Sequence, residues 1–109
     1  MEIGDRVTTI LNINDTTVET FGEGVFDGYS IPEGAVGCKA ELALNNKCES
    51  PRIKLDQGGV VFGCECWFGP PVSFGERKVE KAILSEWRAF ESHKHEHTGK
   101  WGEYQQCAP

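Results

Sequence analysis

Four consecutive residues, Cys64-Glu65-Cys66-Trp67, carry the side chains best suited to chemistry. On a β-strand the two thiols would share one face, as a pair of zinc ligands can, and Glu65 and Trp67 would share the other. This spacing is a weaker zinc signature than a Cys-x-x-Cys knuckle, so we assign no metal and no cofactor. The weak candidates for metal ligands are Cys64, Cys66, His93, His95 and His97.

The three histidines lie in a polar segment without a clear period. They would share a face on a strand, and His93 and His97 would share one on a helix. We interpret residues 93–109 as a polar C-terminal tail in which these histidines are incidental.

Catalysis by a cysteine is not favoured. A nucleophilic thiol needs a base or a positive field nearby, and Glu65 would act in the opposite direction on both of its neighbours. No phosphate-binding loop, dinucleotide-binding glycine pattern or Ser-His-Asp spacing stands out. The sequence therefore predicts a protein that is not an enzyme.

Charge is distributed unevenly along the 109 residues. Residues 1–38 hold seven acidic residues and one basic residue, whereas residues 39–109 hold ten of each, so the N-terminal third carries the whole net charge of −6. Such a field disfavours direct binding to nucleic acid and favours a partner with a basic surface. Four of the acids have the same strand parity, which predicts one acidic outer face unless a bulge intervenes: Asp15, Glu19, Glu23 and Asp27.

Aromatic residues at strand ends complete a candidate binding surface. Aromatic side chains beside carboxylates suit a basic or proline-rich peptide, or an arginine-bearing patch of a protein. In the alternative interpretation, Trp67 and Phe68 cover the core beneath a C-terminal helix. The predicted partner-binding residues are Asp15, Glu19, Glu23, Asp27, Tyr29, Glu65 and Trp67.

Most of the elements that must position these residues are extended. Residues 4–11 and the glycine-interrupted residues 16–30 predict strands, and residues 35–46 predict a short helix. A hairpin follows, with strands at Arg52–Leu55 and Val60–Trp67 around a turn at Asp56–Gly59. Ser73 and Glu76 have the spacing of a capping box. The apolar residues from Val79 to Phe90 recur in helical steps, which predicts an amphipathic helix over residues 74–91.

Two segments carry a resemblance to known proteins. Gly4-Asp5-Arg6-Val7 and the glycine-rich residues 22–28, followed by a hairpin, resemble the opening of an SH3-like small β-barrel. The Gly63–Trp67 string is similar to the hairpin end of small uncharacterised bacterial and phage proteins. The SH3-like resemblance implies binding of peptides, proteins or nucleic acids rather than catalysis, although fold alone does not fix function.

We therefore expect one α+β domain over residues 1–92, a strongly bent antiparallel SH3-like sheet or barrel with a short inserted helix and a C-terminal helix. The chain shows neither a secretory leader nor an apolar run of roughly 20 residues, so we expect a cytoplasmic protein that does not enter membranes. An odd number of cysteines predicts free thiols at Cys38, Cys48, Cys64, Cys66 and Cys107.

The predicted function is non-enzymatic binding to a protein with a basic surface, for example by a phage-type inhibitor or adaptor that acts on a nucleic-acid-binding partner. The oligomeric state is left open. Two alternatives remain. One is a zinc-stabilised structural domain, and the other is a nucleic-acid-binding barrel that would use Lys39, Lys47, Arg52 and Lys54.

Overall fold

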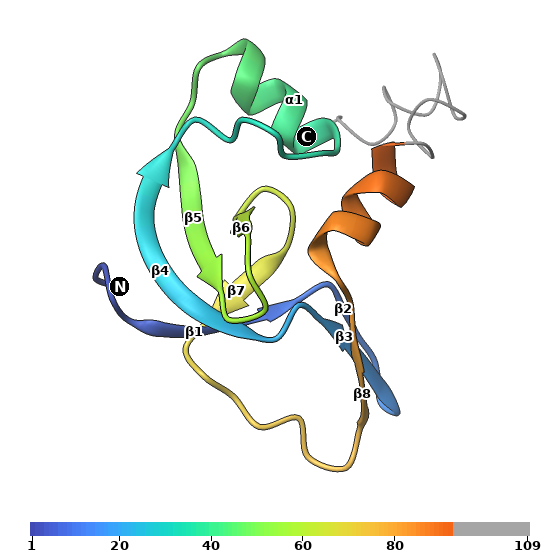
Figure 1. Cartoon of the computed structure of the whole chain (residues 1–109). Coiled ribbons are helices and arrows are strands. Elements are labelled where there is room, and N and C mark those ends of the chain that lie inside the picture. Colours follow the sequence, from blue (N-terminus) through green and yellow to red (C-terminus); the bar gives the residue numbers. More distant parts are fainter. Residues whose placement is uncertain (93–109) are drawn as a thin grey trace.

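The computed structural model describes residues 1–92, and the predicted tail with His93, His95 and His97 lies outside the described residues. Within residues 1–92 the strands form a five-stranded and a three-stranded sheet (Figure 1). The large sheet has the order β6-β5-β4-β1-β7 and consists of β1 (Arg6–Ile10), β4 (Glu23–Ser30), β5 (Ser50–Leu55), β6 (Val60–Phe62) and β7 (Trp67–Gly69). The small sheet has the order β2-β3-β8 and consists of β2 (Asn12–Ile13), β3 (Thr17–Thr20) and β8 (Lys78–Lys81).

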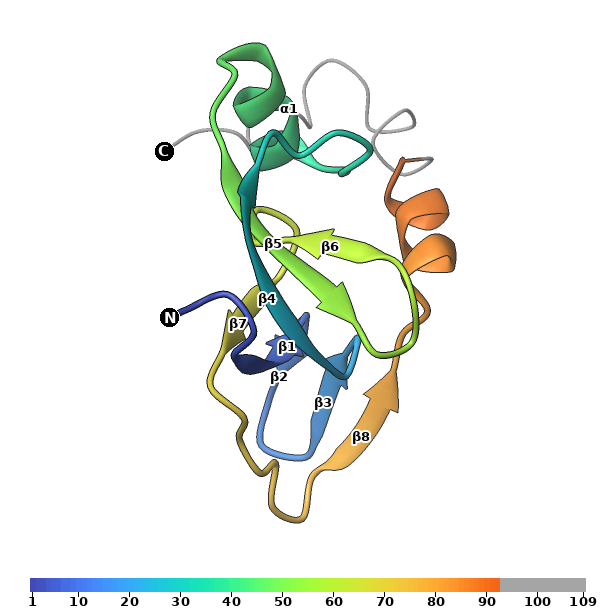
Figure 2. The ribbon, with the colours of Figure 1, turned by 60° about the vertical axis from the view of Figure 1, so that its left-hand side comes forward.

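All strand pairs are antiparallel except β3 with β8, which is parallel. The expected α+β class is confirmed, but the sheet is not closed into a barrel, because β6 and β7 remain its two edges. Figure 2 shows β8 as the outermost strand of the small sheet, beside β3.

The chain passes between the two sheets at a corner built from two buried threonines. Thr9 Oγ1 donates to the carbonyl of Gly22 (2.9 Å) and accepts from the N–H of Phe21 (3.2 Å). Thr20 Oγ1 accepts from the N–H of Gly22 (2.8 Å) and donates to the carbonyl of Thr9. Gly22 has φ 90°, a conformation that side chains disfavour. These hydroxyls add hydrogen bonds to backbone groups at the bend, beside the one that the N–H of Thr9 donates to the carbonyl of Gly22 (3.1 Å).

The hairpin differs from its prediction in the returning strand. β6 ends at Phe62, and residues 63–66 form a turn before β7 pairs with β1. Gly63 sits where a Cβ would lie 3.0 Å from the Pro51 ring and 3.1 Å from Phe68. Cys64 and Cys66 are therefore turn residues, and the prediction that alternation places Glu65 on an outer face is wrong.

The short inserted helix is confirmed as α1 (Cys38–Asn45), but the helix predicted over residues 74–91 is wrong in its first half. Ser73 Oγ accepts only from the N–H of Gly75 (3.3 Å), and the chain then extends as β8. Helical structure begins at Leu84, whose N–H donates to Gln57 Oε1 (3.0 Å), and covers residues 84–92, here termed the C-terminal helix.

The apolar residues from Val79 to Phe90, which predicted the helix, are only partly buried. Val79, Ile83 and Phe90 are exposed. Trp87 is half-buried and packs edge-on against Phe21, with ring centroids 5.4 Å apart.

The core lies between the large sheet and the C-terminal helix. Its buried side chains come from the large sheet, from the helix and, in the case of Phe21, from the corner between β3 and β4: Val7, Phe21, Phe26, Ile53, Leu55, Val61 and Leu84. Phe68 packs against this core, whereas Trp67 does not, so the alternative in which both residues cover the core holds for Phe68 alone. None of the helices in the described part of the chain has the length and apolar character needed to cross a bilayer.

Candidate partner-binding surface

Trp67 forms the wall of an open apolar groove. The indole is 58% exposed and lies over Gly69, where a Cβ would be 2.7 Å from Trp67 Cη2. Register places Trp67 opposite Ile10 of β1. The groove measures about 460 Å³ and is lined by Ile10, Leu11, Asn12, Ile13 and Trp67.

The groove lies where the edges of two sheets meet. β7 is an edge strand of the large sheet, and β2, which follows β1 almost directly in the chain, is an edge strand of the small sheet. Ile13 is 45% exposed on this edge. Edge strands carry backbone donors and acceptors that can pair with a further strand, so the site offers apolar contacts and backbone hydrogen bonds together.

Two of the predicted acids lie beside this groove. Asp15 is exposed in the turn between β2 and β3, which is held by the Asn14 side chain. Glu19 is exposed in β3 and stands opposite Asn12 of the groove in the strand register. Neither Asp15 nor Glu19 has an ion-pair partner among residues 1–92.

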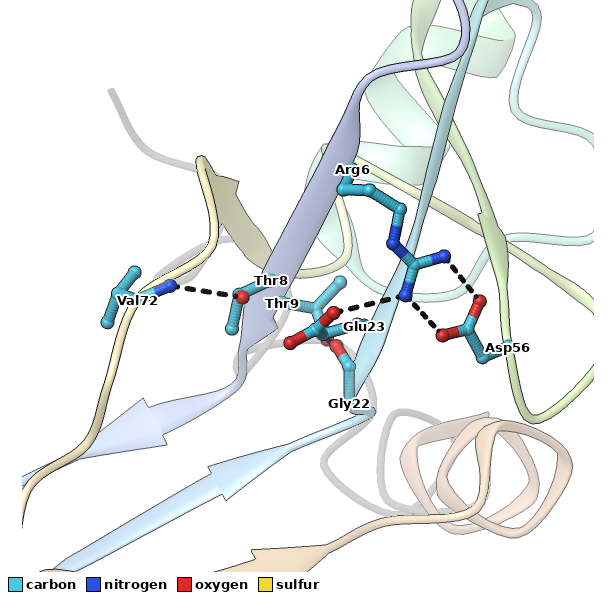
Figure 3. A network of polar contacts seen from close by, with 7 residues as sticks. All are labelled: Arg6, Thr8, Thr9, Gly22, Glu23, Asp56 and Val72. Atoms are coloured by element: carbon cyan, nitrogen blue, oxygen red, sulfur yellow. Dashed lines mark hydrogen bonds and ion pairs between the residues drawn. The ribbon is translucent and has the colours of Figure 1, made fainter.

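The other two predicted acids, Glu23 and Asp27, have ion-pair partners. Arg6 Nη2 lies 3.0 Å from Glu23 Oε1, and the same guanidinium binds both carboxylate oxygens of Asp56 (Figure 3). These hydrogen bonds raise the pKa of Arg6 and hold the pKa of Asp56 below its usual range. Arg52 donates from Nε and Nη2 to one oxygen of Asp27, at 3.0 and 2.8 Å.

The expected single acidic face is therefore wrong in two respects. Its four residues are split between β3 and the turn before it in the small sheet, and β4 in the large one. Strand parity also fails to carry across the Thr20–Gly22 corner and the β-bulge between Phe26 and Tyr29. Arg6 and Arg52, which both lie outside residues 15–27, supply the bases that residues 15–27 lack.

Tyr29 is exposed but belongs to a different part of the surface. It pairs in register with Pro51 near the end of β4, and its ring contacts Phe26 edge-on at 5.4 Å. Val25 is already opposite Arg6, the first residue of β1, whereas Trp67 is opposite Ile10, the last. Tyr29 and Trp67 therefore lie at opposite ends of the large sheet.

Glu65 is buried, so the expectation that it is exposed beside Trp67 is wrong. Its Oε1 accepts from Arg88 Nη2 (2.7 Å) and from the N–H of Phe62 (3.0 Å). Its Oε2 accepts from Arg88 Nε (2.8 Å) and from the N–H of Val36 (3.2 Å). We call Glu65 and Arg88 the buried ion pair; it ties the 63–66 turn to the loop before α1 and to the C-terminal helix.

The thiols near this pair are not prepared for nucleophilic chemistry. Burial, reinforced by Glu65, raises the pKa of Cys66 to about 12, and burial also raises the pKa of Cys64. Cys48, Cys64 and Cys66 are free, as predicted, whereas Cys38 is disulfide-bonded, so the prediction of free thiols is wrong at Cys38. Cys107 lies outside the described residues. Within residues 1–92, no three cysteine, histidine or acidic side chains gather as metal ligands would.

A second cleft, of about 530 Å³, contains Arg52 and Arg88 beside Ser30, Ile31 and Phe62. Both guanidinium groups already bind carboxylates, Arg52 that of Asp27 and Arg88 that of Glu65. The cleft therefore offers an anion less positive charge than its two arginines suggest.

Comparison of the chain with family models, with curated proteins and with solved structures finds no match. The groove and its charges are therefore the basis on which a function can be inferred.

Proposed function

We propose that this protein is a non-enzymatic binding module whose Trp67 groove holds an extended, basic segment of another protein. The observation that carries the proposal is an exposed tryptophan lining an apolar groove at two sheet edges, with Asp15 and Glu19 unpaired by any described base beside it. Tryptophan is among the residues that contribute most to binding energy at protein interfaces.

The apolar lining of the groove and the strand edge beside it both suit an extended ligand. Ile10, Ile13 and Trp67 offer apolar contact, and the adjoining edge can accept backbone hydrogen bonds, as in recognition by strand addition. Glu19 stands one strand inward from the groove, about 5 Å away by the ordinary strand spacing, which is within reach of a lysine or arginine on the ligand. The net charge of −6 would speed the approach of a basic partner at low salt.

The strand order supports an SH3-like assignment as part of the same proposal. β1, β4, β5 and β6 follow one another across the large sheet, and β7 returns to the free side of β1. An inhibitor or adaptor of a basic, nucleic-acid-binding protein is the form of this function that the charge favours. The nucleic-acid-binding alternative loses support, because Asp27 neutralises Arg52, one of its four proposed bases.

Affinity capture from a native cell extract, followed by mass spectrometry, tests the proposal. Trp67→Ala should remove the captured partner, whereas Tyr29→Ala, which truncates an equally exposed aromatic at the other end of the large sheet, should keep it. A partner lost equally from both variants, or from neither, would contradict binding in the groove.

The acidic contribution is tested separately with the captured partner in purified form. The double variant Asp15→Lys/Glu19→Lys should slow association and weaken its salt dependence. The control Glu41→Lys/Glu49→Lys makes the same change in net charge at exposed positions in and after α1. Equal effects of the two variants would show that only net charge matters.

A further inference from the structure

The outer edge of β8 is exposed and has backbone groups to spare. All four residues of β8 are exposed, and Val79 is 51% exposed. The N–H of Lys78 donates to the carbonyl of Thr16 (2.9 Å) and that of Ala82 to the carbonyl of Thr20 (2.8 Å). Since backbone groups alternate sides along a strand, those of Val79 and Lys81 face away from β3. Figure 2 shows β8 with no described strand on that side.

The charges along this edge are ordered but unpaired. Lys78 and Glu80 flank Val79, and neither has an ion-pair partner within residues 1–92. On β3 the neighbour of Glu80 is Glu19, so two like charges stand directly opposite each other. Such a pair is destabilising, and a cation on the other side of Glu80 would relieve it.

From this pattern we infer that β8 pairs with β8 of a second copy of this chain, antiparallel about a two-fold axis at Val79. Val79 then stands opposite the partner's Val79, with two backbone hydrogen bonds exchanged between them. Lys78 stands opposite the partner's Glu80, and Glu80 opposite the partner's Lys78. The same three residues thus complement themselves, as an isologous contact requires, and the two small sheets join into one.

In this register the next positions outward carry like charges, which weaken the contact. The register brings Arg77 toward the partner's Lys81, although each of these side chains is held toward its own chain. Arg77 Nε donates to the carbonyl of Asn14 (2.6 Å), and Nη1 donates to that of Phe74 (3.2 Å). Lys81 lies over Gly22 and its charge helps to lower the pKa of Asp56. Because the edge is short and the chain carries a net charge of −6, the dimer is a weak one.

Sedimentation equilibrium of the full chain over a concentration series up to about 1 mM tests the inference. The unmodified chain should shift from monomer to dimer. Lys78→Glu or Glu80→Lys alone converts two attractive pairs into two repulsive ones and should weaken dimerisation by roughly tenfold or more. The double variant Lys78→Glu/Glu80→Lys restores both attractions and should restore the dimer. A chain that stays monomeric up to about 1 mM, single variants that dimerise as before, or a double variant that stays monomeric would each overturn the inference.

Two further variants separate the edge from the rest of the molecule. Val79→Pro removes an N–H that the β3 ladder does not use, so it should abolish the dimer while the circular dichroism spectrum of the monomer is retained. Trp67→Ser should leave dimerisation unchanged, because the groove lies on other strands. Loss of the dimer in Trp67→Ser would mean that copies associate through the groove, and the β8 assignment would be wrong.

Discussion

Two of the ion-paired sites, Glu65 with Arg88 and Arg6 with Glu23 and Asp56, place carboxylate and guanidinium groups in opposite environments. In the buried ion pair the Glu65 side chain is fully buried and that of Arg88 is 23% exposed. In the cluster of Arg6, Glu23 and Asp56, each side chain is about half exposed, at 46%, 50% and 53%. The buried carboxylate is held by four donors, two of them backbone N–H groups, whereas the exposed cluster competes with water at every contact.

The two sites therefore have different roles: the buried one holds the fold together, and the exposed one changes the charge of the surface. A buried charge that loses its partner keeps its desolvation cost, so breaking such a pair is expensive even where forming it gains little. Exposed pairs contribute little to stability but change the local field. The buried ion pair therefore fixes the position of the C-terminal helix, while the single positive charge of Arg6 offsets one of the two negative charges of Glu23 and Asp56 at the surface.

The largest effect is expected from breaking the buried ion pair. Arg88→Met leaves the Glu65 carboxylate buried without its cation and should lower the free energy of unfolding by about 3–5 kcal/mol. Urea denaturation followed by tryptophan fluorescence measures it. The double variant Glu65→Leu/Arg88→Met removes both charges and should recover much of the loss. An Arg88→Met protein as stable as the parent would show that water reaches Glu65 and that the pair is not buried in solution.

The ion pairs and the elements around them also show which features of the structure the sequence could predict. β1, α1 and the turn between β5 and β6 follow from local signals: β-branched residues, helix formers and the Gly58-Gly59 pair. The partner of Glu65 lies 23 residues away and that of Asp27 lies 25 away, so no local pattern reveals either pair. Gly63 was the available sign that the strand ends before Glu65.

The helix prediction over residues 74–91 fails for a different reason. Val79, Ile83 and Trp87 fit a helical period, but pairing of β8 with β3 outweighs that local preference. For the candidate site, the aromatic wall at Trp67 was predicted. The groove residues Ile10 to Ile13 were missed, because their exposure depends on β7 beginning opposite Ile10 and not earlier.

An intermediate effect is expected at the thiols. With a pKa of about 12, the Cys66 thiol is ionised in roughly one molecule in a thousand at pH 9, and its burial slows attack further. Iodoacetamide labelling followed by peptide mass spectrometry should therefore modify exposed Cys48 first, Cys64 next and Cys66 last.

The same measurement connects the thiols to the buried ion pair. Arg88→Met should accelerate labelling of Cys66, because it loosens the turn that Glu65 holds, and leave Cys48 unchanged. Arg52→Met, which breaks the more exposed pair with Asp27, is the matched control and should leave both rates unchanged. If Cys66 reacts as fast as Cys48 in the unmodified protein, the buried position of the turn is wrong.

The smallest effect is expected from the exposed cluster. Hydrogen bonds from Arg6 are the main cause of the lowered pKa of Asp56, whose ordinary value is 3.8. A carboxyl whose pKa is lower in the folded than in the unfolded chain stabilises the fold above its ordinary pKa. That contribution disappears as the pH falls through the lower folded value. Arg6→Met should therefore leave the melting temperature at pH 7 almost unchanged and move the NMR titration midpoint of Asp56 up toward 3.8. It should also reduce the loss of stability that occurs as the pH falls below 3.8. Arg52→Met should not move that midpoint, because Arg52 binds Asp27 instead.

An Asp56 midpoint that is unchanged in Arg6→Met would mean that Lys81, the other cation acting on Asp56, lowers the pKa of Asp56 instead. The contrast between the buried and the exposed site would then rest on the buried one alone.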